Sequence, residues 1–333
     1  MESMDSLATP AGGVNNNALN ADGTVNTNDT TNSAAGSFTP TNSAAGIAGS
    51  FSAVNTTAAG ASSPMGERPI ALRAVDLVKD YGKGENLVHA LRDVSVSFER
   101  GAFTAIMGPS GSGKSTLMHT LAGLDSITSG QIIFDGHDIT DFNDKQLTLM
   151  RREKVGFIFQ SFNLLPMFDA RQNILMPLTL ANKRVDKEWL DLLVNALGLQ
   201  DRLTHRPAEM SGGQQQRVAI ARALISKPSV IFADEPTGNL DSVSSAEVLT
   251  LMRDLVKQLG QTIVMVTHDA TAASYTDRAI ILADGQIVAD REHPQAQEMS
   301  DLLTSIMQEI VGKQASAHRL SAHSVHSLNA SQA

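Results

Sequence analysis

The sequence predicts an α/β protein built on a mainly parallel β-sheet, with a helical subdomain inserted between two of its strands. Three observations lead to this prediction. Apolar strand-like segments alternate with helix-like segments, which is typical of a parallel sheet covered on both faces. A glycine-rich loop at 108–113 joins a buried strand to a helix. Between about 161 and 213 the alternation stops and the pattern is mostly helical.

Each expected strand is marked by apolar residues and bounded by turn residues. The segment 88–101 alternates at Val94, Val96 and Phe98, as a half-buried strand does. Asp-Gly turns at 135–136 and 284–285 indicate antiparallel elements beside the parallel sheet. Strands are therefore expected at 71–82, 88–101, 103–108, 131–139, 155–160, 229–235, 262–269 and 279–290.

The expected helices end at glycine or proline. Gly198 and Gly260 follow two of them and Pro228 follows a third, because glycine caps helices and proline cannot continue them. Helices are expected at 114–124, 141–154, 186–197, 214–226, 242–259 and 299–311.

These segments divide the chain into three parts. Residues 1–67 are mostly Ala, Ser, Thr, Asn and Gly without apolar periodicity, so a disordered tail without a secretory signal is expected. The folded domain is expected at 68–292, with the helical subdomain at about 161–213. Residues 293–333 form a C-terminal extension, in which the helix at about 299–311 has one apolar face and precedes a disordered end. That face predicts a helix docked on the body of the protein or on a partner.

Composition limits the classes of protein. The chain has 333 residues, of which 42% are apolar, enough for a sizeable core. Its net charge of −9 and its lack of a basic block argue against nucleic acid as a partner, because phosphate neutralisation needs clustered Lys and Arg. Without cysteine no disulfide forms. The apolar runs are far shorter than the roughly 20 residues that span a bilayer, so no membrane span is expected.

A phosphate-binding loop is the most specific motif of the chain. Residues 108–115, GPSGSGKS, fit the pattern GxxxxGK[ST] between a buried strand and a helix. In such a P-loop, backbone N–H groups surround phosphate oxygens, and the helix N-terminus adds its positive end. Lys114 is expected on the β- and γ-phosphates, Ser115 on Mg²⁺ and Thr116 near the α-phosphate. The loop residues expected to bind ATP are Gly108, Ser110, Gly111 and Gly113.

Polar side chains follow three other expected strands. Asp234 and Glu235 end an apolar strand, where ligand sites of parallel sheets form. Asp234 is expected to hold Mg²⁺, and Glu235 to orient and polarise the attacking water. Gln160 is expected to contact Mg²⁺ or that water, and His268 to donate to the γ-phosphate. Taken singly, the Asp-Glu pair and Gln160 are more often solvated strand ends, and a lone His at a strand end is usually structural.

Two further features complete the expected nucleotide site. Tyr81 precedes the sheet, where an aromatic ring can stack on adenine. Ser211, Gly212 and Gly213 lie before a helix and form a second anion site by the logic of the first. One nucleotide cannot easily use both sites, but two chains paired head to tail can share each nucleotide between them. The alternative for this stretch is an ordinary serine N-cap.

The ordered set of motifs resembles the nucleotide-binding subunit of an ATP-binding cassette (ABC) transporter. The motifs are GPSGSGKST, Gln160, SGGQQ, VIFADE, Asn239-Leu240-Asp241 and His268, and the resemblance covers about residues 68–292. It implies a P-loop NTPase fold of the ABC cassette type, ATP with Mg²⁺, and a head-to-tail dimer. It also implies that Gln214 and Asp241 belong to the nucleotide site and that 239–241 couples the two sites. Met210 replaces the usual Leu, a similar volume that preserves the packing.

A closer resemblance is to the lipoprotein-release and macrolide-export ATPases (LolD/MacB type). It rests on VGFIFQSFNLLP at 155–166, on SGGQQQRVAIARAL and on DEPTGNLD. This subgroup implies an ATPase that powers export or extraction through a separate membrane permease, at the cytoplasmic face of the plasma membrane. The apolar residues expected to line the permease groove are Phe162, Leu164, Leu165, Met167 and Phe168.

Two other functions remain open from the sequence. A cell-division ATPase shares PTGNLD and would regulate cell-wall enzymes through a permease-like partner, without transport. A soluble ATPase acting on DNA or ribosomes fits less well. Members that act on DNA carry a coiled-coil insertion, and no heptad run occurs between Lys114 and Ser211.

Overall fold

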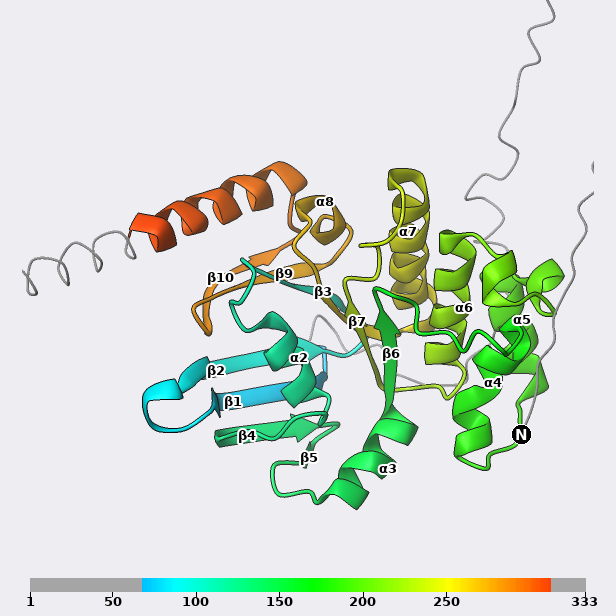
Figure 1. Cartoon of the computed structure of the whole chain (residues 1–333), viewed down its shortest axis with the longest axis horizontal. Coiled ribbons are helices and arrows are strands. Elements are labelled where there is room, and N and C mark those ends of the chain that lie inside the picture. Colours follow the sequence, from blue (N-terminus) through cyan, green and yellow to red (C-terminus); the bar gives the residue numbers. More distant parts are fainter. Residues whose placement is uncertain (1–67, 313–333) are drawn as a thin grey trace, which may run out of the picture. The chain divides into compact units, whose positions relative to one another are not determined.

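The computed structural model describes residues 68–312, which form two β-sheets with helices around them (Figure 1). The larger sheet has the order β10-β9-β3-β8-β7-β6, in which only β10 runs antiparallel to its neighbour. Its strands are β3 (Phe103–Met107), β6 (Val155–Phe159), β7 (Val230–Asp234), β8 (Thr262–Val266), β9 (Arg278–Ala283) and β10 (Gln286–Glu292). The predicted α/β fold with a mainly parallel sheet is therefore confirmed.

The smaller sheet is antiparallel and has the order β2-β1-β4-β5. Its strands are β1 (Ile70–Tyr81), β2 (Val88–Glu99), β4 (Ser129–Phe134) and β5 (His137–Asp138). The turn between β1 and β2 contains a 3-10 turn at Gly84–Asn86. The Asp-Gly turn at 135–136 joins β4 and β5 of this sheet, and the turn at 284–285 joins the antiparallel pair β9 and β10 of the larger sheet.

The central strands divide their side chains between two hydrophobic cores. In β7, Ile231 and Ala233 pack into one core, whereas Val230 and Phe232 pack into the other. The first core lies against the helical part of the chain and the second against the smaller sheet and the helix after the P-loop. Because both faces are covered, all residues of β3 and β8 are buried, which explains their continuous apolar sequences.

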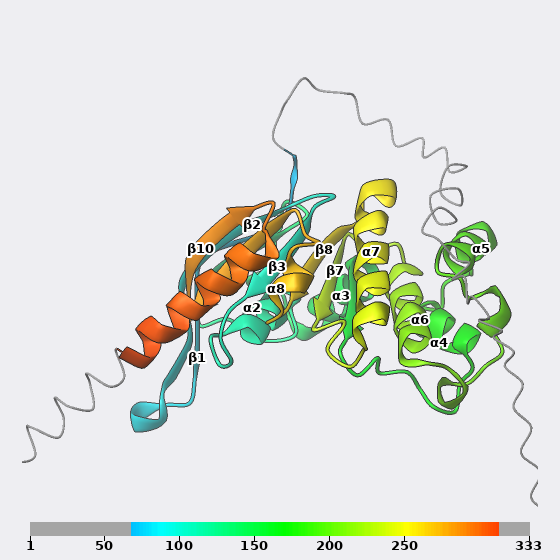
Figure 2. The ribbon, with the colours of Figure 1, turned by 90° about the horizontal axis from the view of Figure 1, so that it is seen from above.

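The chain between β6 and β7 is mostly helical, and Figures 1 and 2 show its helices to one side of the sheets. It contains α4 (Ala170–Leu180), α5 (Lys187–Ala196), the 3-10 turns Gln200–Arg202 and Pro207–Glu209, and α6 (Gly212–Leu224). The remaining helices are α2 (Lys114–Leu121), α3 (Asp144–Lys154), α7 (Ser242–Leu259) and α8 (Ala270–Ala273).

α3 and α6 begin two or more residues from the predicted starts, because polar side chains cap them. The helix expected from Asp141 begins at Asp144, since Asn143 accepts a bond from the backbone N–H of Gln146. The helix expected from Gln214 begins two residues earlier, since Ser211 forms a capping box with Gln214. The two glycines of the Ser-Gly-Gly motif therefore lie inside the first turn of α6.

A C-terminal helix over 296–312 covers the residues where the sequence predicted one. Met299 is buried in the first core, and Leu302, Leu303 and Ile306 pack against that core. Figures 1 and 2 show the start of this helix beside α8 and β10. The amphipathic pattern thus reflects docking on the body of the protein.

The disordered ends that the sequence predicts, at 1–67 and 313–333, lie outside the described residues. No helix within 68–312 has both the length and the apolar character that a bilayer span requires.

Asn173 anchors the segment that leads from β6 into the helical part. Its side chain is fully buried on α4. Its Oδ1 accepts from the backbone N–H of Leu165 at 2.8 Å, and its Nδ2 donates to the carbonyls of Leu165, Phe168 and Asp169. One side chain therefore holds the loop between Gln160 and α4 in place.

Replacing this anchor should destabilise the protein. Asn173→Leu keeps the volume but leaves buried backbone groups of the loop unpaired, so the free energy of unfolding should fall by about 1–3 kcal/mol. Urea denaturation with an unchanged m-value measures this. The matched control is Asn195→Leu on α5, where the exposed side chain makes a change within about 0.5 kcal/mol the expectation. Equal losses for both variants would contradict the anchoring role.

Candidate functional site

The register of the parallel strands gathers the predicted site residues at one edge of the larger sheet. Phe159 of β6 pairs with Asp234 of β7, and Asp234 pairs with Val266 of β8. β3 joins this edge through the pair Ile106–Val266. Gln160, Glu235, Thr267 and the P-loop therefore follow side by side where the strands end, the position at which α/β sheets bind ligands.

The shape of the P-loop depends on glycines that no other residue can replace. Gly108 has φ +144°, and an added Cβ would lie 2.0 Å from the Leu282 carbonyl oxygen. Gly113 has φ +102°, and an added Cβ would lie 2.5 Å from the Ala90 carbonyl oxygen. The backbone carbonyls of β9 and β2 thus leave no room for a side chain at these two positions of the loop.

Lys114 places its charge inside this loop. Its Nζ donates to the carbonyl oxygens of Gly108 and Pro109 at 2.9 and 2.7 Å. The side chain is buried, and burial lowers the pKa of its ammonium, while the carboxylates of Glu235 and Asp234 act in the opposite direction. A phosphate would supply the missing counter-charge. The neighbouring Ser110, Gly111 and Ser115 are exposed at the same loop.

Asp234 is half-buried beside Lys114. Burial is the main cause that raises the pKa of its carboxyl; Glu235 raises it further, whereas His119 and Lys114 lower it. Its ionised form is therefore unfavourable in the protein alone and would be stabilised by a cation. Together with the exposed Ser115 hydroxyl, this donor set fits the hard oxygen ligands that Mg²⁺ prefers.

Glu235 and His268 lie in contact. Nδ1 of His268 is 2.9 Å from Oε1 of Glu235, and the backbone N–H of Glu235 donates to the Val266 carbonyl at 2.9 Å. Glu235 has φ +45°, a conformation that residues other than glycine rarely adopt. A cavity of about 450 Å³ adjoins both side chains, between α7 and α8. The two residues predicted to act on water and on the γ-phosphate thus form one unit.

Gln160 is held by the loop that follows Glu235. Its Nε2 lies 3.4 Å from Oδ1 of Asn239, and Nδ2 of Asn239 donates to the Gln160 carbonyl at 3.1 Å. A Cβ added to Gly238 would lie 2.6 Å from Gln160 Nε2, so this side chain packs directly on the glycine. The Gly238-Asn239 pair thus determines where the glutamine amide lies.

Tyr81 is fixed by two residues that sequence reasoning missed. Its hydroxyl donates to Oδ2 of Asp125 at 2.5 Å, and Lys79 bridges to the other oxygen of Asp125 at 2.8 Å. Lys79 Nζ also lies 4.6 Å from the centre of the tyrosine ring, which remains 41% exposed. Burial and the Asp125 bond raise the pKa of Tyr81, while a bond to Thr116 lowers it, so the ring lies close to the helix of the P-loop.

The Ser-Gly-Gly motif lies elsewhere. Added Cβ atoms at Gly212 and Gly213 would lie 3.1 and 3.3 Å from the side chains of Leu240 and Ser244, whereas Gly108 and Gly113 of the P-loop lie against the strands β9 and β2. Figures 1 and 2 both show α2 and α6 apart from each other. A single chain therefore does not bring its two glycine motifs together.

Two side chains that the resemblance assigned to the nucleotide site serve as helix caps here. Gln214 Oε1 accepts from the backbone N–H of Ser211 at 3.0 Å. Asp241 Oδ1 accepts from the N–H groups of Val243 and Ser244 at 3.0 Å, and the bonds from Ser244 are the first causes that lower the pKa of Asp241. Gln214 thus stabilises the start of α6, and Asp241 stabilises the start of α7. These bonds lie within the two helix starts and do not involve the P-loop.

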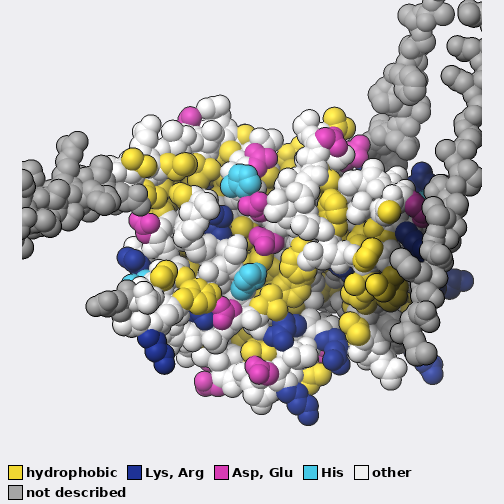
Figure 3. Space-filling view, viewed as in Figure 1, with side chains coloured by type: hydrophobic (Ala, Val, Ile, Leu, Met, Phe, Trp, Pro, Cys, Tyr) yellow, Lys and Arg dark blue, Asp and Glu magenta, His cyan; other side chains and the backbone are white. Residues whose placement is uncertain are grey.

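The surface above the site is rich in ionisable groups. Figure 3 shows Asp, Glu and His side chains along the middle of one face, over α8, β3 and α2. Hydrophobic side chains gather on the same face near β6 and over α4 and α6. The ionisable side chains near the strand edge thus lie next to an apolar surface.

A P-loop, two carboxylates at the same sheet edge, and a separate glycine helix start in an inserted helical region define a P-loop NTPase of the ATP-binding cassette class. The chain belongs to the ABC transporter family, whose model, described as "ABC transporter", matches residues 91–238. The predictions of an ATPase and of this family are therefore confirmed.

Relatives place the chain near two groups within the family. It is 45% identical over 221 residues to a lipoprotein-releasing system ATP-binding protein LolD from Geobacter metallireducens, covering 66% of this chain and 98% of that protein. It is 46% identical over 237 residues to a macrolide export ATP-binding/permease protein MacB from Marinobacter nauticus. That match covers 70% of this chain but 36% of the relative, so the chain spans about a third of the exporter's length.

A solved structure is similar as well. It is the dimeric post-hydrolysis state of the ATP-binding cassette MJ0796 bound to ADP and Pi, with 38% identity and a TM-score of 0.61. The match covers 67% of this chain and 98% of the other. Together with the relatives, it confirms the resemblance to the LolD/MacB subgroup and the cassette fold.

The effect of the Asp234 charge on protein stability can be measured without nucleotide. Its folded-state pKa is raised above the unfolded value of about 3.9, so the folded state loses stability as the pH rises through the unfolded pKa, and this loss is complete above the folded-state pKa. Asp234→Asn should therefore raise the melting temperature at pH 7, and the gain should shrink as the pH falls toward 4. Thermal unfolding monitored by circular dichroism across this range measures the effect.

Asp186→Asn is the control with the opposite sign. A bond from Lys227 is the first cause that lowers the pKa of Asp186, so its charge stabilises the protein above the unfolded pKa and this contribution is lost on acidification. Asn caps α5 about as well as Asp. This variant should melt lower at pH 7, with a difference that vanishes in acid. A lower melting temperature for Asp234→Asn at pH 7 would contradict the burial argument.

Proposed function

We propose that this chain binds and hydrolyses ATP as the nucleotide-binding subunit of an ABC transporter complex, as a dimer that drives a separate membrane permease. The observation that carries the proposal is the strand edge that unites the P-loop, Asp234, Glu235, Gln160 and His268. Nucleotide binding is supported by the related cassette that was solved with ADP and Pi.

The P-loop residues bind the phosphates. Lys114 exchanges its two carbonyl partners for the β- and γ-phosphate oxygens, and the N–H groups of the loop and of α2 surround them. Thr116 lies near the α-phosphate and the Tyr81 ring stacks on adenine. Ser115, Asp234 and Gln160 would hold Mg²⁺. The chemistry that this ion would supply is partial neutralisation of the phosphate charge.

Glu235 supports the attack of water on the γ-phosphorus. Its carboxylate orients the water and accepts its proton as the bond between the γ-phosphorus and the bridging oxygen breaks, which leaves ADP and phosphate. His268 holds the carboxylate through the 2.9 Å contact and can donate to the γ-phosphate. Gln160 is bonded to Asn239, so a shift of Gln160 on ligand binding moves the loop at Asn239.

A second copy of the chain completes each site. Because the Ser211-Gly212-Gly213 helix start lies apart from the P-loop of its own chain, it is available to the nucleotide of a partner in a head-to-tail dimer. Dimeric structures of the related cassette MJ0796 support this assembly. ATP then joins the two chains, and its hydrolysis releases them.

Glu235→Gln should trap the closed dimer. The amide cannot accept the proton, so the hydrolysis rate should fall about 10²- to 10⁴-fold while ATP binding persists. Size-exclusion chromatography with light scattering, in ATP and Mg²⁺, should show a dimer that ADP does not support. The matched control adds Lys114→Ala to this variant, which should remain monomeric. A Glu235→Gln protein that stays monomeric with ATP would count against the two-chain site.

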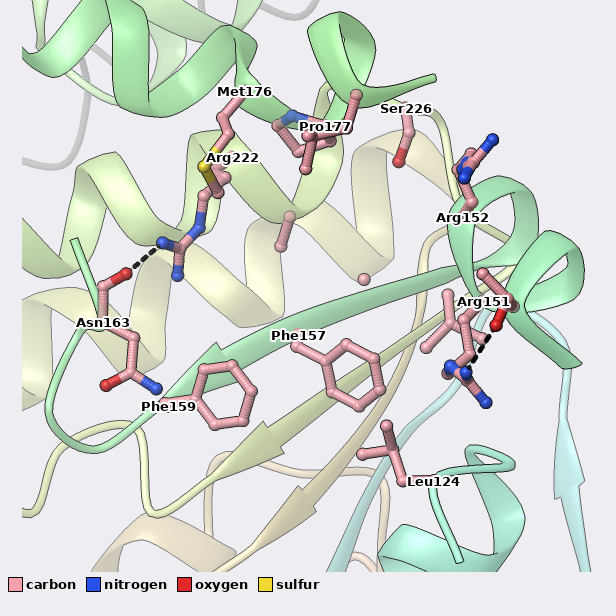
Figure 4. Close-up of a pocket in the computed structure, with 15 residues that line it drawn as sticks. Leu124, Arg151, Arg152, Phe157, Phe159, Asn163, Met176, Pro177, Arg222 and Ser226 are labelled. Atoms are coloured by element: carbon pink, nitrogen blue, oxygen red, sulfur yellow. Dashed lines mark hydrogen bonds between the residues drawn. The ribbon is translucent and has the colours of Figure 1, made fainter. Parts of the chain in front are cut away.

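An apolar groove beside β6 is the proposed docking site for the permease. It has a volume of about 600 Å³, and Figure 4 shows Phe157 and Phe159 of β6 between Leu124 on one side and Met176 with Pro177 of α4 on the other. Its full lining is Leu124, Thr148, Arg151, Arg152, Val155, Gly156, Phe157, Phe159, Asn163, Met176, Pro177, Leu180, Arg222, Ala223 and Ser226. Its size and apolar floor suit an amphipathic helix of a partner.

The sequence suggested Phe162, Leu164, Leu165, Met167 and Phe168 as the lining of the permease groove, and none of these residues lines the cavity beside β6. Of the loop 162–168 only Asn163 reaches it, while Leu164 packs into the first core and Met167 is 68% exposed elsewhere. The reason is the backbone of Phe162 and Asn163, both with positive φ, whose carbonyls Arg222 holds. Arg222 thus fixes the turn that precedes these apolar residues.

Export or extraction is the coupled function that the relatives support. The names of LolD and MacB proteins state lipoprotein release and macrolide export, and this chain covers nearly all of the former and a third of the latter. A subunit of this kind lies peripherally at the cytoplasmic face of the plasma membrane, bound to its permease. Regulation of cell-wall enzymes through a permease-like partner uses the same motor residues and differs only in the partner.

Co-purification distinguishes these functions. The Glu235→Gln chain, tagged in its native host and solubilised in mild detergent with ATP, should retain an integral permease identified by mass spectrometry. Leu180→Asp in the groove should abolish this retention without loss of the ATP-trapped dimer. A division-type permease together with cell-wall hydrolases would favour the regulatory function. Ribosomes or DNA without a membrane protein would overturn both.

A further inference from the structure

The third glutamine of the run at 214–216 contacts the turn that carries Glu235. Gln216 lies in the first part of α6 and its side chain is fully buried. Its Nε2 donates to the carbonyl oxygen of Pro236 at 2.7 Å. Pro236 directly follows Glu235, so α6 is tied to the backbone next to the proposed catalytic carboxylate.

The turn at Glu235 needs such ties. Its φ of +45° is sparsely populated for a residue with a side chain and persists only where neighbours fix it. The Glu235 N–H donates to the Val266 carbonyl at 2.9 Å, and the Glu235 carbonyl accepts from Gly238 N–H at 3.0 Å. Gln216 holds the next carbonyl along, from the side of the helical region.

Stability alone does not account for a glutamine at this position. The Oε1 atom of Gln216 is buried without a hydrogen-bond partner among residues 68–312. A half-satisfied buried amide is unfavourable compared with an apolar side chain of the same size. The hydrogen bond to the Pro236 carbonyl is therefore the interaction that explains a glutamine at this position.

The same helix begins at the motif assigned to the partner's nucleotide. Ser211 caps α6, and Gly212 and Gly213 form its first turn. Resting on the dimer of the proposed function, we propose that Gln216 is a positioning residue that couples the two nucleotide sites. One end of α6 contacts the partner's nucleotide, while Gln216 sets the orientation of Glu235 in its own chain.

The coupling requires only a rigid helix and one hydrogen bond. When the N-terminus of α6 engages the phosphate held by the partner, the helix shifts as a unit. Through Gln216 the shift moves the Pro236 carbonyl and with it the backbone of Glu235. Gln216 is fully buried and would act only through the Pro236 carbonyl, so its loss should leave binding and closure intact and misplace the carboxylate.

The test removes the donor and keeps the volume. For Gln216→Met, kcat for ATP hydrolysis should fall about 10- to 100-fold, the range expected when a catalytic group shifts by about 1 Å. The Kd for ATP should stay within about threefold, and the Hill coefficient for ATP should fall toward 1. In the Glu235→Gln background, Gln216→Met should still form the ATP-trapped dimer.

The matched control is the neighbouring glutamine. Gln215 Nε2 donates to the Met210 carbonyl at 3.1 Å and makes no bond to the Glu235 turn. Gln215→Met should therefore keep kcat within about threefold of the wild-type value and keep the Hill coefficient. An equal loss of kcat in both variants would overturn the specific role of Gln216.

Three further results for the Gln216 variants would overturn the coupling role. A wild-type kcat and Hill coefficient for Gln216→Met would overturn the coupling, as would loss of the trapped dimer. If Gln216→Met does not fold, Gln216→Leu is measured in the same way, and unfolding of both assigns the residue to stability alone. Failure of the proposed function is separate, because the wild-type chain itself would then neither hydrolyse ATP nor give a dimer with Glu235→Gln.

Discussion

Parallel pairing of β3, β8, β7 and β6 is the constraint on which the site depends. Residue pairs such as Phe159–Asp234–Val266 fix the point at which each strand ends, so that Gln160, Glu235 and the P-loop emerge at one level. A slip of one residue would turn every side chain of a strand to the opposite face. The two cores prevent such a slip, because alternate residues of β7 are buried on opposite faces of the sheet.

The site assembled at this edge is unfavourable to the protein alone. Lys114 is buried among carbonyls, Asp234 has a raised pKa, and Glu235 holds a left-handed backbone. Such features persist where the surrounding structure over-determines them. A ligand with phosphate and a cation would offset the buried charges of both signs and thereby stabilise the folded chain. The burial of Lys114 and Asp234 thus favours a ligand that carries charge of both signs.

α6 begins at the Ser-Gly-Gly motif and contacts the turn after Glu235 and the loop after β6, and so connects the proposed functional regions. Its first turn carries the Ser-Gly-Gly motif, Gln216 holds the Pro236 carbonyl, and Arg222 near its end holds the carbonyls of Phe162 and Asn163. Arg222 and Asn163 also line the groove beside β6. A displacement of this helix therefore reaches the proposed dimer interface, the catalytic turn and the proposed permease site together.

The sequence by itself determined what depends on consecutive residues: the P-loop, the apolar strands, the helix stops and the membership of the ABC family. These are local patterns of chain conformation and burial. The tertiary structure alone decided the contacts of Tyr81 with Asp125, of Gln160 with Asn239 and of Gln216 with Pro236, as well as the residues that line the cavity beside β6. These partners are far apart in the chain, and no local pattern encodes them. They meet because strand register and the positive φ values near Phe162 set where each segment turns.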